Sequence, residues 1–133
     1  MSDERGFVAI EWVLAVALLL LPIVVLVATL PGWVERRHAA GVAAREVATI
    51  VVQDGGGVDV GEATRRADEV AQNYGVEPDD IDVSVRGASG RGEYVTVEVR
   101  VRMPAISVPG LVEAGGWTFT ATQHRRLDDY RSR

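Results

Sequence analysis

Residues 7–34 read FVAIEWVLAVALLLLPIVVLVATLPGWV, and this stretch decides the fold class. Its 28 residues contain one charged side chain, Glu11. The part that ends at Leu30 would be about 36 Å long as a helix, and the hydrocarbon core of a bilayer is about 30 Å thick. The 99 residues that follow could hardly cover a helix that is apolar all round. The sequence therefore predicts a transmembrane helix over residues 7–34.

A cleavable secretory signal fits these residues less well than a membrane span. Secretory signals begin with basic residues and have an apolar region of about 7 to 15 residues. This chain begins MSDERG, with two acids and one Arg, and its apolar run is longer. An ionised carboxylate such as Glu11 would cost about 2.5 to 3.5 kcal/mol inside the apolar region. We therefore expect Glu11 to have a compensating partner.

A short motif marks the start of the apolar run. In the stretch GFVAIEW, Gly6 and Phe7 are followed by Glu11 and Trp12. This stretch resembles the processing site of type IV prepilin-like proteins, and a Glu followed by an aromatic residue is similar to the variant in the Tad (tight adherence) pilus system. The resemblance implies that a membrane-embedded aspartic prepilin peptidase cuts after Gly6 and leaves Phe7 as the new amino terminus. Residues 1–6 would then be a prepilin-type leader.

The spacing within the motif suits a charge pair. After cleavage Phe7 would carry an ammonium group, and Glu11 lies four residues on, on the same face of a helix. A carboxylate in lipid is stabilised by a nearby cation, so Glu11 could pair with the ammonium of its own chain or of a neighbouring subunit during assembly. Two simpler explanations stay open. Glu11 could lie near the headgroups and reach water, and Gly6 could be a flexible residue before a helix.

The charges that flank the apolar run bear on its orientation. Arg5 precedes the run and Arg36 and Arg37 follow it, so the positive-inside rule alone favours a cytoplasmic carboxyl end. The processing motif favours the opposite orientation, because it fixes the amino end at the cytoplasmic face. We expect a cytoplasmic amino terminus and an extracytoplasmic domain over residues 35–133. The side chains expected at the membrane interfaces are Trp12, Trp33, Arg36 and Arg37.

The next part of the chain predicts two helices. Residues 35–53 are rich in Ala and Val and read as a continuation of the first helix, which the glycines at 55–57 end. A second helix begins at Asp59, with Glu62 three residues on in a capping-box-like pattern, and its apolar residues recur at helical spacing until Gly75. The pairs expected on its exposed face are Glu62 with Arg66 and Arg65 with Glu69.

The pattern then changes from helical spacing to alternation. Apolar and polar residues alternate over 81–86, over 95–103 and over 117–122, which predicts a hairpin and a third strand. Pro104 and Pro109 interrupt the chain between the last two strands. The apolar face of a small sheet needs a cover, and the two helices supply it. The expected fold class is α+β, in which a long N-terminal helix, a second amphipathic helix and a small three-stranded antiparallel sheet form two layers.

The order of helix, helix, hairpin, Pro-rich crossover and strand resembles that of TadE-like minor pseudopilins. The stretch YVTVEVRVRMPAISVPGLVEAGGWTFTATQHRR looks like the closing part of that family. The resemblance implies a structural subunit in the cytoplasmic membrane that takes part in Tad/Flp-type pilus assembly. Its implied partners are other pilin and pseudopilin subunits, the prepilin peptidase and the Tad inner-membrane assembly platform. The alternatives are a pseudopilin of a type II secretion apparatus and an uncleaved, single-pass membrane-anchored binding domain.

Composition argues against several other classes of function. The chain has no Cys, which excludes disulfides and thiolate zinc sites, and His38 and His124 have no spacing typical of a metal site. A net charge of -5 argues against a nucleic-acid partner. No Ser lies in a nucleophile-elbow context, and the glycines form no phosphate-binding loop. We expect no enzyme activity, no cofactor, no metal and no small-molecule substrate.

Overall fold

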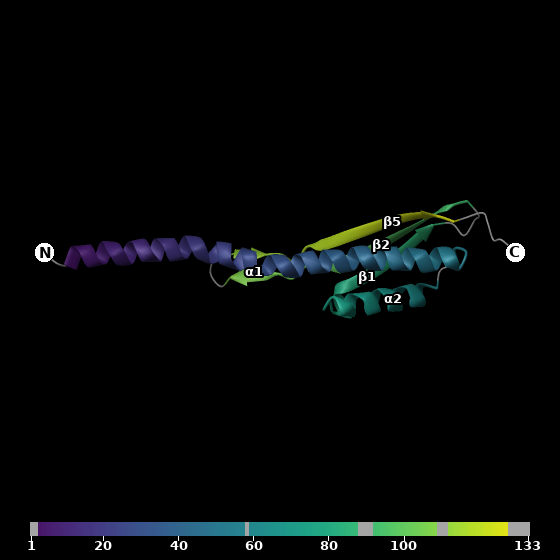
Figure 1. Cartoon of the computed structure of the whole chain (residues 1–133), viewed down its shortest axis with the longest axis horizontal. Coiled ribbons are helices and arrows are strands. Elements are labelled where there is room, and N and C mark those ends of the chain that lie inside the picture. The colour runs from purple at the N-terminus through teal and green to yellow at the C-terminus, as the bar shows by residue number, and fades with distance from the viewer. Residues whose placement is uncertain (1–2, 58, 88–91, 109–111, 128–133) are drawn as a thin grey trace. The chain divides into compact units, whose positions relative to one another are not determined.

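The computed structural model describes residues 3–57, 59–87, 92–108 and 112–127 (Figure 1). Pro109, where we expect an interruption of the chain, lies outside these ranges, as do residues 88–91 and 128–133. The chain divides into two compact units, residues 1–32 and residues 33–133. Helix α1 (Asp3–Gln53) contributes to both units and continues through Pro22 and Pro31. The expected continuation of the first helix to residue 53 is confirmed.

The second unit contains a three-stranded antiparallel sheet. Its strands are β1 (Ile81–Gly87), β2 (Tyr94–Arg102) and β5 (Thr118–Arg126), in the spatial order β1-β2-β5. The central valines of β2 face the apolar residues of both neighbours; Val101, for example, lies opposite Ile81 and Phe119. Strand β5 is longer than the alternation over 117–122 predicts, because it pairs with β2 along its whole length. The expected hairpin and third strand are confirmed.

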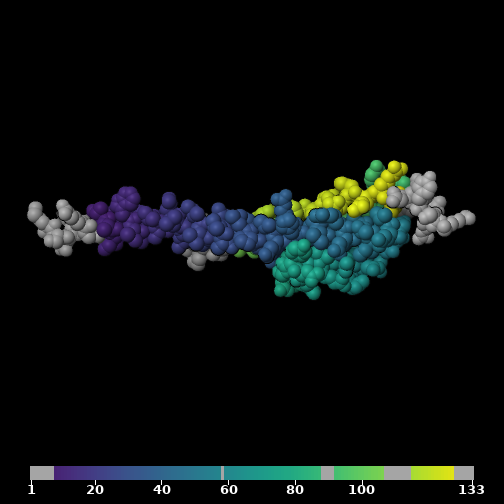
Figure 2. Space-filling view, viewed as in Figure 1, coloured from purple at the N-terminus to yellow at the C-terminus, as the bar shows by residue number. Residues whose placement is uncertain are grey.

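Two helices cover the apolar face of this sheet. One is the part of α1 from residue 33 to Gln53, and the other is α2 (Val60–Asn73), which lies against it (Figure 2). The helices contribute mostly small side chains to the core, so their backbones can approach the sheet closely. The buried core consists of Ala39, Ala40, Ala43, Ala44, Val47, Ala48, Val51, Ala63, Ala67, Val70, Ala71, Val76, Val95, Val97, Val99, Val101 and Leu127. The α+β class with two layers is therefore observed.

Both helices end in the same glycine-dependent turn. After α1, Gly55 has a φ of 71° and donates to the carbonyl of Val52, while the next N–H donates to Val51 at 2.9 Å. After α2, Gly75 has a φ of 67° and the next N–H donates to Ala71 at 2.9 Å. This Schellman arrangement needs a residue with positive φ, which glycine adopts without a steric penalty. The expected ends of both helices are confirmed.

The start of α2 differs in detail from a capping box. The carboxylate of Asp59 caps the helix, but it accepts from the N–H of Gly61 at 2.9 Å. Glu62 instead lies 3.6 Å from Arg65 in an ion pair. Of the two expected exposed pairs, Arg65 with Glu69 is present at 3.0 Å.

The segment between β2 and β5 contains a hairpin that the sequence pattern does not predict. Strands β3 (Ile106–Val108) and β4 (Val112–Ala114) pair with each other in a separate two-stranded sheet. Strands of three residues are too short to show a convincing alternation, so this element could not be recognised from sequence. Gly115 directly follows β4 and has a φ of 116°, and a Cβ there would lie 2.5 Å from the carbonyl oxygen of Pro104.

Candidate functional site

The N-terminal part of α1 exposes apolar side chains on every face. Between residues 8 and 30 every Leu and Ile side chain is exposed. Successive helical residues are rotated by about 100°, so the run Leu18, Leu19, Leu20 and Leu21 covers all sides of the helix rather than one stripe. By length and composition alone, this helix is long and apolar enough to cross a membrane. The expected long apolar helix is therefore present.

The processing motif belongs to the same helix. Gly6 and Phe7 lie in the helical backbone of α1, although the side chain of Phe7 is outside the described part of the structure. Phe7 and Glu11 are one helical turn apart, about 6 Å along the axis, and therefore lie on one face. The side chain of Glu11 is exposed among apolar neighbours, and the ring of Trp12 is 70% exposed. The backbone geometry is thus compatible with a pair between a Phe7 ammonium and Glu11.

Arg36 lies in the second unit and connects α1 to two other elements. Its Nη1 atom lies 2.8 Å from Oδ2 of Asp80, which belongs to the short 3-10 helix η1 (Pro78–Asp80). The same nitrogen donates to the carbonyl oxygen of Arg102, the last residue of β2, at 2.7 Å. The Arg36 and Asp80 side chains are only 18% and 24% exposed. Arg36 therefore fastens the first turns of α1 in this unit to one end of the sheet.

Trp33 and Arg37 contact the chain just before and within β5. The rings of Trp33 and Trp117 are 6.2 Å apart at an interplanar angle of 74°, an edge-to-face contact. The guanidinium of Arg37 lies 5.5 Å from the centre of the Phe119 ring, within cation–π range. Three of the four residues expected at a membrane interface therefore also hold α1 to the sheet. No local pattern in the sequence indicates Asp80, Trp117 or Phe119 as their partners.

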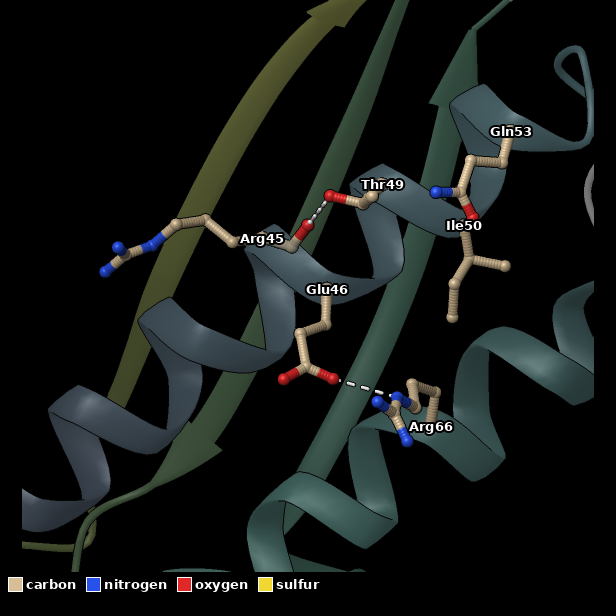
Figure 3. Close-up of a pocket in the computed structure, with 6 residues that line it drawn as sticks. All are labelled: Arg45, Glu46, Thr49, Ile50, Gln53 and Arg66. Atoms are coloured by element: carbon tan, nitrogen blue, oxygen red, sulfur yellow. Dashed lines mark hydrogen bonds and ion pairs between the residues drawn. The ribbon is translucent and has the colours of Figure 1, made fainter.

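A shallow groove of 310 Å³ lies between α1 and α2 (Figure 3). Glu46 and Arg66 point toward each other across it, with Oε2 and Nε 2.8 Å apart. Arg66 also pairs with Glu69 at 2.9 Å. The hydrogen bond to Glu69 and the negative charge of Glu46 raise the pKa of Arg66 above its ordinary value. The pair between Glu46 and Arg66 links α1 to α2, whereas Arg45, the third charged residue that lines the groove, donates to the carbonyl of Gly41.

The described ranges contain no group of three or more His, Cys, Asp or Glu side chains that could hold a metal ion. Both histidines lie on the surface of the second unit. His38 is exposed on α1, and Nδ1 of His124 lies 2.9 Å from the hydroxyl of Thr96 on the neighbouring strand.

Two features of α1 are therefore the candidates for function. One is the apolar segment over residues 8–30 with its single acid, and the other is the set of contacts that Trp33, Arg36 and Arg37 make with the sheet. Comparison with known proteins assigns neither of them, because no protein-family model, curated protein or solved structure matches this chain.

Proposed function

We propose that this chain is a membrane-anchored structural subunit, a TadE-like minor pseudopilin of a Tad/Flp-type pilus assembly system, without enzymatic activity. The observation that carries the proposal is the exposure of apolar side chains on all faces of α1 over residues 8–30. Apolar surface left in water costs about 25 cal/mol per Å². A bilayer removes this surface from water along the whole helix and around its circumference.

The free energy of insertion stays favourable in spite of Glu11. Residues 8–30 contain fifteen Val, Leu and Ile residues, which contribute at most about 5 to 9 kcal/mol on insertion scales. One carboxylate at the centre of a span costs about 2.5 to 3.5 kcal/mol. Glu11 therefore does not prevent insertion, but its cost favours a cationic partner. The proposed partner is the ammonium of Phe7 after cleavage, in the same chain or in a neighbouring subunit.

The proposed topology follows from the motif. The peptidase cuts after Gly6 on the cytoplasmic side, residues 7–34 lie in the cytoplasmic membrane, and residues 35–133 form the extracytoplasmic domain. The proposed partners are other pilin and pseudopilin subunits, the prepilin peptidase and the inner-membrane assembly platform. The hydrophobic core of the second unit supports a separate domain after the span, because its residues begin at Ala39 and include none of the apolar segment.

Mass spectrometry of the amino terminus tests this proposal. The chain is purified from the membrane fraction of cells with and without the prepilin peptidase. We expect an amino terminus at Phe7 in the first strain and at Met1 in the second. Recovery of an intact Met1 terminus from peptidase-containing cells would overturn the pseudopilin proposal and favour the uncleaved, single-pass anchored binding domain.

A further inference from the structure

Trp117 exposes a large aromatic surface beside Trp33, the first residue of the second unit. Its side chain is 48% exposed, and its ring contacts that of Trp33. Trp33 follows Leu30 by three residues in the same helix. Residues distant in the sequence thus form a pair of indole rings directly after the apolar run.

We infer that Trp117 lies in the headgroup and glycerol region of the membrane and forms a second lipid contact of the folded domain. This inference rests on the proposed insertion of residues 7–34. Three residues of helix rise by about 4.5 Å, and the headgroup region on each side of a bilayer is about 5 to 7 Å thick. If Leu30 ends in the hydrocarbon, Trp33 lies at headgroup level. The ring of Trp117 is 6.2 Å from that of Trp33 and is therefore within reach of the same layer.

The chemistry of the neighbouring side chains fits this environment. Tryptophan is enriched at membrane–water interfaces, because its ring is largely apolar and its N–H is polar. Arg37 is exposed and, within the part of the chain that the structure describes, has no acidic partner. Its guanidinium is available to a lipid phosphate. Arg36, by contrast, is paired with Asp80.

The charges at this end of the sheet indicate which lipids are involved. A small surface pocket of 180 Å³ is lined by three acids and two arginines, namely Asp79, Asp80, Asp82, Arg100 and Arg102, together with Ile81 and Thr118. The acids offset the arginines, so the surface has no strong excess of positive charge. The contact therefore depends on the aromatic rings and occurs with a zwitterionic headgroup, without a requirement for anionic lipid.

The three tryptophans at positions 12, 33 and 117 make the inference testable by fluorescence in the full chain. The W12F/W33F variant retains Trp117, and the W33F/W117F variant retains Trp12. Tyr94→Trp in a background that lacks the other tryptophans is the matched control, because Tyr94 is 64% exposed and begins β2 at the end opposite Arg102. Each variant is reconstituted in phosphatidylcholine vesicles in which bromine atoms are placed near the headgroups or deep in the acyl chains. Acrylamide quenching from the aqueous phase is measured in parallel.

We expect Trp117 to lose fluorescence to the shallow bromines more than to the deep ones, and to lose less to acrylamide than the Tyr94→Trp control. Quenching of Trp12 by bromolipid with no quenching of Trp117 would overturn the inference and leave membrane insertion standing. No bromolipid quenching at either position would overturn insertion itself. Protection of Trp117 from acrylamide without bromolipid quenching would also overturn the inference, because another protein surface would then cover the ring. If W12F/W33F loses its circular dichroism signal, the W12F variant keeps the Trp33–Trp117 pair, and the difference in quenching between W12F and W12F/W117F reports on Trp117.

Discussion

Arg36→Ala should lower the free energy of unfolding of the second unit by about 2 kcal/mol. The change removes an ion pair of 2.8 Å to Asp80 and a hydrogen bond of 2.7 Å to the carbonyl oxygen of Arg102. Hydrogen bonds that involve a charged group contribute about 1.5 to 3 kcal/mol. Asp80 is 24% exposed, so solvent would compensate only in part for its lost partner. The conformational entropy that the Arg36 side chain loses when it is held in place offsets part of this contribution. We therefore expect a loss near the lower end of the range for hydrogen bonds to charged groups.

Arg37→Ala is the matched control, because this arginine is adjacent in the sequence but is exposed and makes a cation–π contact of 5.5 Å. Such contacts contribute about 0.5 to 1 kcal/mol at exposed sites. Urea unfolding of the full chain in neutral detergent, followed by fluorescence of a retained Trp117, measures both variants. In an Asp80→Asn background the effect of Arg36→Ala should be smaller, since the ion pair is already weakened. Equal unfolding midpoints for Arg36→Ala and Arg37→Ala would refute the anchoring role assigned to Arg36.

Two further predictions concern other parts of the chain. Glu11→Ala should leave membrane insertion intact or improve it, because a charge is removed from the proposed span, but should reduce pilus assembly as counted by electron microscopy. Normal piliation would contradict the proposed charge-pairing role. Gly115→Ala should destabilise the second unit in the same urea assay, because a Cβ would lie 2.5 Å from the Pro104 oxygen and 2.6 Å from Cα of Ala105. Gly116 has open space around it, so Gly116→Ala should lower the free energy of unfolding by only about 1 to 2 kcal/mol. Equal losses for the two glycine variants would show that the hairpin adjusts to the added methyl group.

The elements that depend on local sequence could be predicted. The alternation over 95–103 corresponds to β2, whose valines are buried while Arg100 and Arg102 are exposed. The glycines after both helices mark their ends correctly, because a positive φ is a local requirement that the residue type reveals. The α+β class follows from the order of these elements.

The contacts that fasten α1 to the sheet could not be predicted. Arg36 and Asp80 are 44 residues apart, and no periodic pattern links them. The spacing of four residues predicts Glu62 as the partner of Arg66, and this prediction is wrong. Arg66 instead contacts Glu69, which is near in sequence, and Glu46, which only the packing of α1 against α2 brings close. Side-chain partners on an exposed helix face are separated by small free energies, so tertiary packing decides among them.

The side chains of α1 change in size at the boundary between the two units, and this change explains how one helix can serve two environments. Up to Leu30 its exposed residues are mainly Leu, Ile and Val, which present a large apolar surface that lipid chains can solvate. From Ala39 onward its buried positions are mainly alanines, which are too small to contribute much area but let the sheet and α2 come close. If the two compositions were exchanged, leucines would be too large for the buried positions of α1 in the core, and alanines would make the proposed insertion less favourable. Under the proposed insertion, the two halves of α1 therefore have different surroundings, although the backbone is one continuous helix.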